Sequence, residues 1–226
     1  MLAGMFAFPG MTQLDLTGPH EVLSQLPGVE VMVVAETAEP LTARGGLRLV
    51  PDTTLMEAPQ FDLFLLPGGP GIGRLLEHHG ILKSLRRQAR GADHVASVCT
   101  GSLLLGAAGL LKGRKATTHW ASLDLLPIFG ALPVTGRFVE DANIMTGGGV
   151  TAGIDFALTL AARLFGEEEA KKIQLALEYD PDPPYACGSP GCADPALVAA
   201  VRLSYASLHE ERRRSALRAA RFVFED

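Results

Sequence analysis

The sequence of 226 residues carries 20 Lys and Arg against 25 Asp and Glu, and 47% of its residues are hydrophobic. This length and apolar share suit one sizeable domain with a well-formed core. The net charge of −5 disfavours nucleic-acid binding, since the one basic block, Arg212-Arg213-Arg214, follows Glu210 and Glu211 in the same predicted helix. No apolar run has the length of a membrane span and the N-terminus lacks a signal-like pattern, so we expect a cytoplasmic protein without a membrane partner.

Short apolar runs alternate with helical patterns along most of the chain. In chain order the pattern predicts a strand over 2–8, a helix over 18–26, a strand over 29–35, a hairpin over 41–50, a strand over 63–66, helices over 72–77 and 81–90, and a strand over 94–98. Beyond Cys99 it predicts a buried helix, a strand near 115–118, a short helix near 122–126, strands near 137–140 and 143–146, and a long apolar helix over 151–165. Such alternation predicts an α/β fold with a mainly parallel central sheet sandwiched by helices.

The end of the chain has a different composition. The segment 180–194 is rich in Pro, Gly, Asp and Cys and is predicted to be a loop. It leads to a predicted C-terminal helix over 195–222, with one apolar face at helical spacing formed by Leu197, Val201, Tyr205 and Leu208. We therefore expect one α/β domain over 1–226 that includes this loop and this helix.

Cys99 is the strongest candidate for a reactive residue. It follows the strand over 94–98 and precedes a buried helix, with the small residues Ser97 and Gly101 on either side. This spacing is typical of a nucleophile elbow, a tight turn that pushes one side chain into a cleft. The unpaired N–H groups of a helix N-terminus favour an anion, so we expect the pKa of Cys99 to lie below that of a free thiol. The alternative interpretation is a small buried hydrophobe.

The other cysteines have a weaker pattern. Cys187 and Cys192 lie five residues apart in the predicted loop, and no zinc-ligand spacing accompanies them. They could pair in an oxidising setting, but we interpret them as incidental. Three cysteines are too few for a disulfide scaffold.

Glycines follow several of the predicted strands, at Gly68-Gly69, at Gly101 and at Gly147–Gly149. Loops at the carboxyl ends of parallel strands line one cleft, so these glycines together indicate a ligand site, although each alone is ordinary turn punctuation. The amides of Gly68 and Gly69 could stabilise a developing negative charge as an oxyanion hole does. No dinucleotide fingerprint, P-loop or metal-ligand spacing is present, and we expect neither a cofactor nor a metal.

Asp15 and His119 are the candidates for moving protons. Asp15 lies between the first strand and the predicted first helix, where it could exchange protons with a substrate at Cys99 or simply serve a turn. Glu21 competes for the same role. His119 ends the strand near 115–118 beside Trp120, the only tryptophan, and is either a cleft-lining base or a packed structural residue.

Several segments carry a family resemblance together: 96–101 (ASVCTG), 66–69 (LPGG), 15–19 (DLTGP), 116–120 (ATTHW), 147–158 (GGGVTAGIDFAL) and 174–179 (QLALEY). With them the chain resembles the class I glutamine amidotransferase-like superfamily, and within it the isocyanide hydratases, over nearly its whole length. The resemblance implies a flavodoxin-like, class I glutamine amidotransferase-like fold. It also implies a homodimer, which the apolar face of the C-terminal helix independently favours.

The resemblance further implies a reaction, the addition of water to an organic isocyanide to give an N-substituted formamide. Cys99 would attack the terminal carbon to give a thioimidate, and Asp15 would hold the thiol and shuttle protons. Thr100 would position the intermediate together with the amides of Gly68 and Gly69. The remaining candidates would line the substrate pocket: His119, Trp120, Gly148 and Val150.

Two other functions stay open. A glyoxalase or deglycase acting on reactive carbonyls would share the cysteine, but a glutamate is expected where this chain has Asp15. A non-catalytic thiol sensor or ligand-binding module would show oxidation of Cys99 without turnover. Thr100 argues against the protease branch, which typically has histidine there, and the single helix over 195–222 leaves no room for the helix-turn-helix pair of the related transcription regulators.

Overall fold

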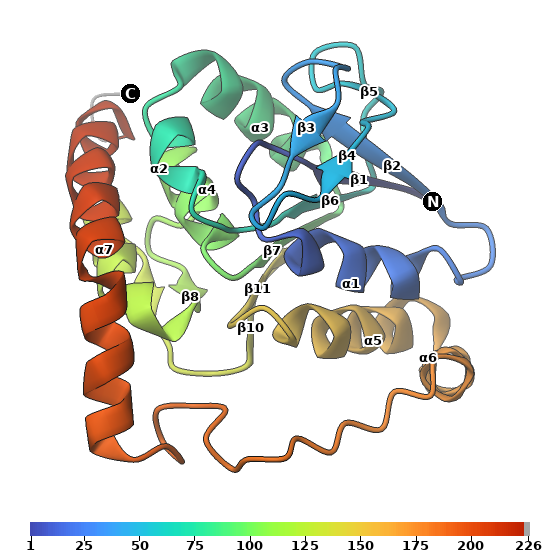
Figure 1. Ribbon diagram of the computed structural model, residues 1–226. Coiled ribbons are helices and arrows are strands. Elements are labelled where there is room, and N and C mark those ends of the chain that lie inside the picture. Colours follow the sequence, from blue (N-terminus) through green and yellow to red (C-terminus); the bar gives the residue numbers. More distant parts are fainter. Residues whose placement is uncertain (224–226) are drawn as a thin grey trace.

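A seven-stranded sheet forms the centre of the computed structural model, which describes residues 1–223 (Figure 1). Its strands are β1 (Leu2–Phe6), β2 (Glu30–Ala35), β5 (Thr53–Thr54), β6 (Leu63–Leu66), β7 (His94–Val98), β10 (Phe138–Asp141) and β11 (Ile144–Gly147). They lie in the order β10-β11-β7-β6-β1-β2-β5, and every neighbouring pair is parallel except β10 and β11. The predicted mainly parallel α/β fold is confirmed; residues 224–226 of the predicted domain lie outside the described residues.

The helices cover both faces of this sheet. They are α1 (Gln13–Leu23), α2 (Ile72–Leu75), α3 (His79–Gly91), α4 (Gly101–Ala107), the 3₁₀ helix η1 (Trp120–Phe129), α5 (Ala152–Phe165), α6 (Glu167–Ala176) and α7 (Pro195–Val223). The connection from β1 to β2 runs along the sheet in the opposite direction to the connections from β6 to β7 and from β7 to β11. Right-handed crossovers in opposite directions place their helices on opposite faces, so α1 lies with α5 on one face, and α3 and α4 lie on the other (Figure 1).

Two small sheets lie outside the central one. Antiparallel β3 (Leu41–Thr42) and β4 (Arg48–Leu49) form the hairpin that the sequence predicts. Parallel β8 (Lys115–Ala116) and β9 (Leu132–Pro133) form the second, so the strand expected near 115–118 is shorter than predicted and does not join the central sheet.

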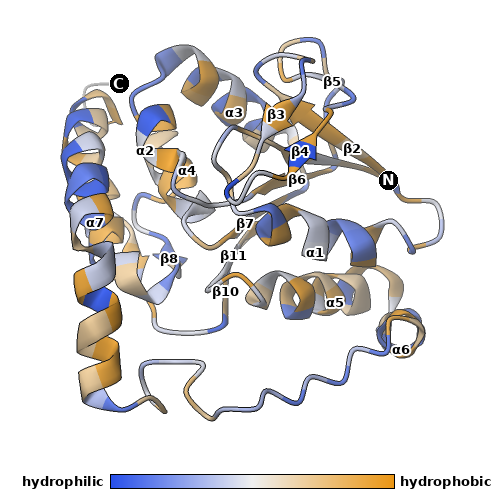
Figure 2. Cartoon of the chain, in the orientation of Figure 1, coloured by the Kyte–Doolittle hydropathy of each residue, from blue (hydrophilic) through white to orange (hydrophobic). Residues whose placement is uncertain are grey.

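The core is built on the central strands. All four residues of β6 are fully buried, as are Met5 and Phe6 of β1, and Figure 2 shows β2 as one of the most hydrophobic segments in view. Helices on both faces explain why these strands are continuous apolar runs rather than alternating ones. Each large apolar side chain buried in this way contributes about 1.5–3 kcal/mol to folding.

The first helix begins earlier than predicted, which changes the setting of Asp15. The Gly18-Pro19 pair suggests a helix start at residue 18, but α1 begins at Gln13 and contains Pro19. The pair serves close packing instead: a side chain at Gly18 would press on Ile154 of α5, and one at Gly153 would press on Pro19. Asp15 therefore lies in the first turn of α1 and not in the loop before it.

The sequence pattern also missed some elements. Helix α6 has a charged surface with only Ala170 and Ile173 buried, so its apolar signal is weak. Strands β5 and β9 are two residues long and lack any periodicity. No helix within residues 1–223 combines the length and apolar character that crossing a lipid bilayer requires.

Candidate functional site

Cys99 lies on a sharp turn between β7 and α4. Its backbone φ is 56°, a left-handed conformation uncommon for residues other than glycine. Its amide is held by the carbonyl oxygens of Gly147 and Gly148 at 3.1 and 2.8 Å. A side chain at Gly101 would collide with the carbonyl of Leu66, which explains why a glycine stands two residues after the cysteine. This strand–turn–helix geometry is typical of a nucleophile elbow.

Asp15 lies beside the Cys99 turn but comes from α1, the helix that follows β1. The direction of the strand connections reverses between β1 and β6, and Asp15 lies on the β1 side of this switch point. Its side chain is fully buried, and Oδ2 accepts a hydrogen bond of 2.9 Å from the amide of Gly68. Within residues 1–223, Oδ1 has no hydrogen bond of standard geometry, although the carboxyl and the Cys99 thiol interact closely enough to shift each other's pKa. Burial raises the pKa of Asp15 to about 7, against the opposing effects of the Gly68 amide and Cys99.

The thiol of Cys99 does not ionise as easily as its place at a helix N-terminus predicts. Burial raises the pKa of Cys99 well above its ordinary value, and the neighbouring Asp15 raises it further. The Thr100 amide and Arg212 lower it, but they do not offset the loss of hydration. The direction of this shift is opposite to the low pKa that the helix N-terminus predicts.

The amides of Gly68 and Gly69 also differ from the expectation. The Gly68 amide donates to Asp15, and the Gly69 amide donates to Oγ1 of Thr100 at 3.0 Å. Both donors are thus occupied, so neither is a free oxyanion-hole donor as the sequence suggested. They instead fix the side chains of Asp15 and Thr100, and a side chain at Gly68 would collide with Thr100.

A cavity of about 680 Å³ adjoins this turn. It is lined by four of the predicted site residues, His119, Trp120, Gly148 and Val150, together with Thr118 and parts of the loop before α7. Thr118 connects the cavity to the turn, since its hydroxyl donates to the carbonyl oxygen of Cys99 at 2.9 Å. The structure therefore brings these four predicted pocket residues together at one cavity, which touches the backbone of the Cys99 turn through Gly148 and Thr118. Among the described residues, Cys99, Asp15 and Thr100 are not part of its lining.

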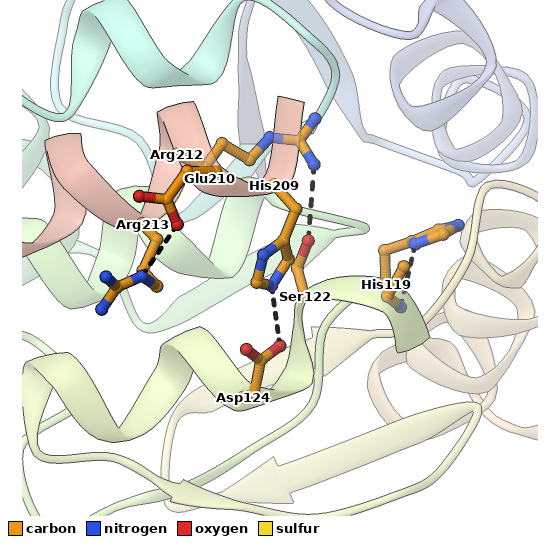
Figure 3. Close-up of polar contacts among 8 residues, drawn as sticks. His119, Ser122, Asp124, His209, Glu210, Arg212 and Arg213 are labelled. Atoms are coloured by element: carbon orange, nitrogen blue, oxygen red, sulfur yellow. Dashed lines mark hydrogen bonds and ion pairs between the residues drawn. The ribbon is translucent and has the colours of Figure 1, made fainter. Parts of the chain in front are cut away.

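His119 has a structural contact as well as a cavity position. Its Nδ1 accepts a hydrogen bond of 3.3 Å from the amide of Ala121 and so caps η1 (Figure 3). Burial lowers the pKa of His119, and the nearby Arg212 lowers it further, so both effects favour the neutral ring. The other proposed proton carrier, Glu21, is exposed on α1 and contacts Gln25.

Two of the sequence motifs meet at the rim of the cavity. The hydroxyl of Tyr179 donates to Oδ1 of Asp155 at 2.9 Å, and Oδ2 of Asp155 pairs with Arg137. Arg137 also donates to the hydroxyl of Thr151, the residue before α5. The segments 147–158 and 174–179 therefore act together to fix the start of α5 beside the cavity.

Arg212 is the buried charged residue that the sequence analysis did not single out. Its side chain extends from α7 and is only 6% exposed, whereas Arg213 and Arg214 beside it are exposed. It donates to the carbonyl oxygen of Gly69 at 3.1 Å. Among the described residues, no group of His, Cys, Asp and Glu side chains has a metal-binding arrangement, and the thiols of Cys99, Cys187 and Cys192 are free.

Comparison with known proteins places this geometry in a family. The chain is 53% identical to an isonitrile hydratase from Pseudomonas putida over 199 residues, which are 88% of this chain and 87% of that protein. It is 28% identical to the glutathione-independent glyoxalase DJR-1.2 of Caenorhabditis elegans over 65% of this chain and 79% of that one. Isonitrile is another word for isocyanide, so the first match confirms the resemblance that the motifs indicate.

The fold has close counterparts among solved structures. The crystal structure of a THiJ/PfpI family protein from Pseudomonas syringae matches with a TM-score of 0.92 and 39% identity, over 95% of this chain and 90% of that one. Residues 2–163, which hold Asp15, Cys99 and the glycine loops, match the DJ-1/PfpI family. The chain therefore belongs to the DJ-1/PfpI family.

Proposed function

We propose that this protein is an enzyme that hydrates organic isocyanides to N-substituted formamides. The observation that carries the proposal is a buried thiol–carboxyl pair, Cys99 and Asp15, in a chain 53% identical to an isonitrile hydratase over almost all of both sequences. An isocyanide needs a soft nucleophile at its terminal carbon and a proton for the same carbon. This pair supplies both from neighbouring atoms.

In the first half of the proposed reaction, the sulfur of Cys99 forms a bond to the terminal carbon of the isocyanide. The thiol proton passes to Asp15 and from there to that carbon, giving a thioimidate on Cys99. A carboxyl group with a pKa of about 7 is suited to this transfer, because it exchanges protons in both directions near neutral pH.

In the second half, water attacks the thioimidate carbon. Asp15 accepts a proton from this water and passes it to the nitrogen, which gives a tetrahedral adduct that carries a hydroxyl group. The carbon–sulfur bond then breaks as this hydroxyl becomes the carbonyl, its proton returns through Asp15 to the sulfur, and the N-substituted formamide leaves. The sum is one isocyanide plus one water, with no oxidant, reductant or added cofactor.

The roles of the neighbouring residues follow from their contacts. The Thr100 amide favours the negative charge that develops on sulfur, and its hydroxyl is held by the Gly69 amide. Gly68 fixes the carboxyl of Asp15. The substrate's organic group occupies the cavity of about 680 Å³, where His119, Trp120 and Gly148 form walls and Val150 limits the space.

We also propose a homodimer in the cytoplasm. The first part of α7 extends beyond the body of the molecule and carries hydrophobic residues (Figures 1 and 2). Leu197 and Leu203 on this part are 45% and 77% exposed. Sedimentation at micromolar concentration tests this assembly, and a monomer contradicts it.

A glyoxalase is the second candidate, since one relative of this chain carries that name. The test is to supply alkyl and aryl isocyanides and, separately, methylglyoxal to the purified protein and to follow the formamide and lactate products. We expect formamide from several isocyanides and far slower use of methylglyoxal. The reverse result would reject the hydratase, and oxidation of Cys99 without turnover of either would favour a thiol sensor.

A further inference from the structure

Arg212 places a positive charge in a buried position. Helix α7 turns its side chain inward, while Arg213 and Arg214 stay exposed and pair with Glu210. Figure 3 shows the contrast: Arg212 extends to the side of α7 that faces Ser122, and Arg213 points away from it toward Glu210. Helical periodicity alone does not explain the burial of a charge at this place, because an apolar side chain of similar length, such as methionine, would fill the space without the cost of removing a charge from water.

The hydrogen bonds of Arg212 are incomplete. One terminal nitrogen donates to the carbonyl of Gly69 at 3.1 Å and the other to the hydroxyl of Ser122 at 3.4 Å. Within residues 1–223, Nε has no acceptor and the guanidinium forms no ion pair with a carboxylate. A buried cation in this state is costly unless an anion forms nearby.

A short chain of contacts connects Arg212 to the thiol. The carbonyl of Gly69 accepts from Arg212, and the amide of the same residue donates to the hydroxyl of Thr100. Thr100 follows Cys99 directly, and its own amide acts on the sulfur. Moving the guanidinium would therefore release the Gly69 loop that holds Thr100.

The charges around the thiol act in opposite directions. Asp15 from α1 raises the pKa of Cys99, and Arg212 from α7 lowers it. Burial lowers the pKa of Arg212, and the opposing effects of Cys99, Tyr205 and Glu211, which favour the charged guanidinium, do not fully offset it. A fixed positive charge thus favours the state in which sulfur is ionised and the proton lies on Asp15.

We propose that Arg212 is a positioning residue for Cys99: it holds the Gly69 loop and supplies the buried positive charge that stabilises the thiolate. Its connection to isocyanide hydration rests on the proposed function, but its effect on the thiol does not. The thiolate is the form that reacts with alkylating agents, so the proposal can be tested without any substrate.

The experiment measures the rate of Cys99 alkylation by iodoacetamide at pH 8, in a Cys187→Ser, Cys192→Ser background where Cys99 is the remaining thiol. Arg212→Met removes the charge but keeps an apolar stem, Arg212→Lys keeps the charge, and Arg213→Met is the matched surface control. We expect Arg212→Met to slow alkylation about tenfold or more, the effect of raising the thiol pKa by about one. Arg212→Lys should retain most of the rate and Arg213→Met all of it.

Two comparisons keep the result decisive. In urea all variants should react at the same rate, because the effect needs the folded site. If Arg212→Met does not fold, Arg212→Gln replaces it, and Arg212→Lys must still react faster than Arg212→Gln. Equal folded-state rates for the charged and uncharged variants would overturn the proposal. A protein that shows the Arg212 effect but hydrates no isocyanide would reject the proposed function alone.

Discussion

The amide of Gly68 donates a hydrogen bond of 2.9 Å to Oδ2 of Asp15, so a backbone group after β6 orients a carboxyl that belongs to α1. This contact joins the loops on either side of the switch point between β1 and β6, where ligands bind in open parallel sheets. It occupies one carboxyl oxygen and leaves Oδ1 available to the thiol of Cys99. Oδ1 is therefore the carboxyl oxygen of Asp15 that can exchange a proton with the thiol.

Substitutions at Asp15 should impair turnover without removing the thiol. Asp15→Asn keeps the shape but cannot shuttle a proton, so we expect kcat to fall by about 10²-fold or more, the usual size of general acid–base catalysis. Asp15→Glu moves the carboxyl by one methylene and should also be poor, because a displacement of ~1 Å can cost about 10²-fold. Steady-state formamide formation measures both; near-normal kcat in both would make Asp15 structural.

The same carboxyl should make stability depend on pH. The pKa of Asp15 rises from an ordinary 3.8 to about 7 on folding, so the native state binds the extra proton between these values. Stability is then highest below pH 4 for this group and declines as pH rises to 7, by up to about 4 kcal/mol. Urea denaturation of wild type and Asp15→Asn at pH 4.5 and pH 8 isolates the effect. The variant should gain stability relative to wild type at pH 8; parallel pH profiles would contradict the prediction.

Gly68→Ala should damage the site by steric collision, without backbone strain. The new methyl group would collide with the backbone nitrogen and hydroxyl of Thr100, at a position where the backbone angle itself is acceptable to alanine. We expect a loss of about 1–3 kcal/mol in unfolding free energy, and a strong loss of turnover, since Thr100 adjoins Cys99. Gly191→Ala is the control, because a methyl group there meets only open space. Equal unfolding free energies for the two variants would show that the Thr100 contact is easily relaxed.

Val150 should set the size of substrate that fits. It lines the cavity of about 680 Å³, and Val150→Phe fills part of that space. We expect kcat/KM for a bulky aryl isocyanide to fall about tenfold or more, while a small alkyl isocyanide loses much less. Measuring both substrates with one variant separates a pocket effect from general damage, which would lower both alike.

The sequence predicted the parts of the site that depend on local pattern. The apolar runs at β6 and β7, each followed by small residues, placed Gly68 and Cys99 at the carboxyl ends of neighbouring parallel strands. From that placement follow the cleft and the nearness of the loop after β1. The motifs then supplied Asp15, which composition and periodicity could not have distinguished from a turn residue.

The rest required three-dimensional packing. The high pKa of Cys99 arises because burial outweighs the helix N-terminus, and the sequence contains no measure of burial at a turn. The occupied amides of Gly68 and Gly69 follow from contacts with α1 and α4. The sequence could not distinguish Arg212 from Arg213 and Arg214, because only the docking of α7 decides which arginine of this triplet is buried.

The central claim is that Cys99 hydrates isocyanides, and the most direct measurement is formamide formation from one aryl isocyanide by wild type and by Cys99→Ala. The two proteins should be equally folded, because the change removes only the sulfur of a buried side chain. We predict many turnovers by wild type and no formamide above the uncatalysed rate with Cys99→Ala. Formation of formamide at comparable rates by both proteins, or by neither, would contradict the account.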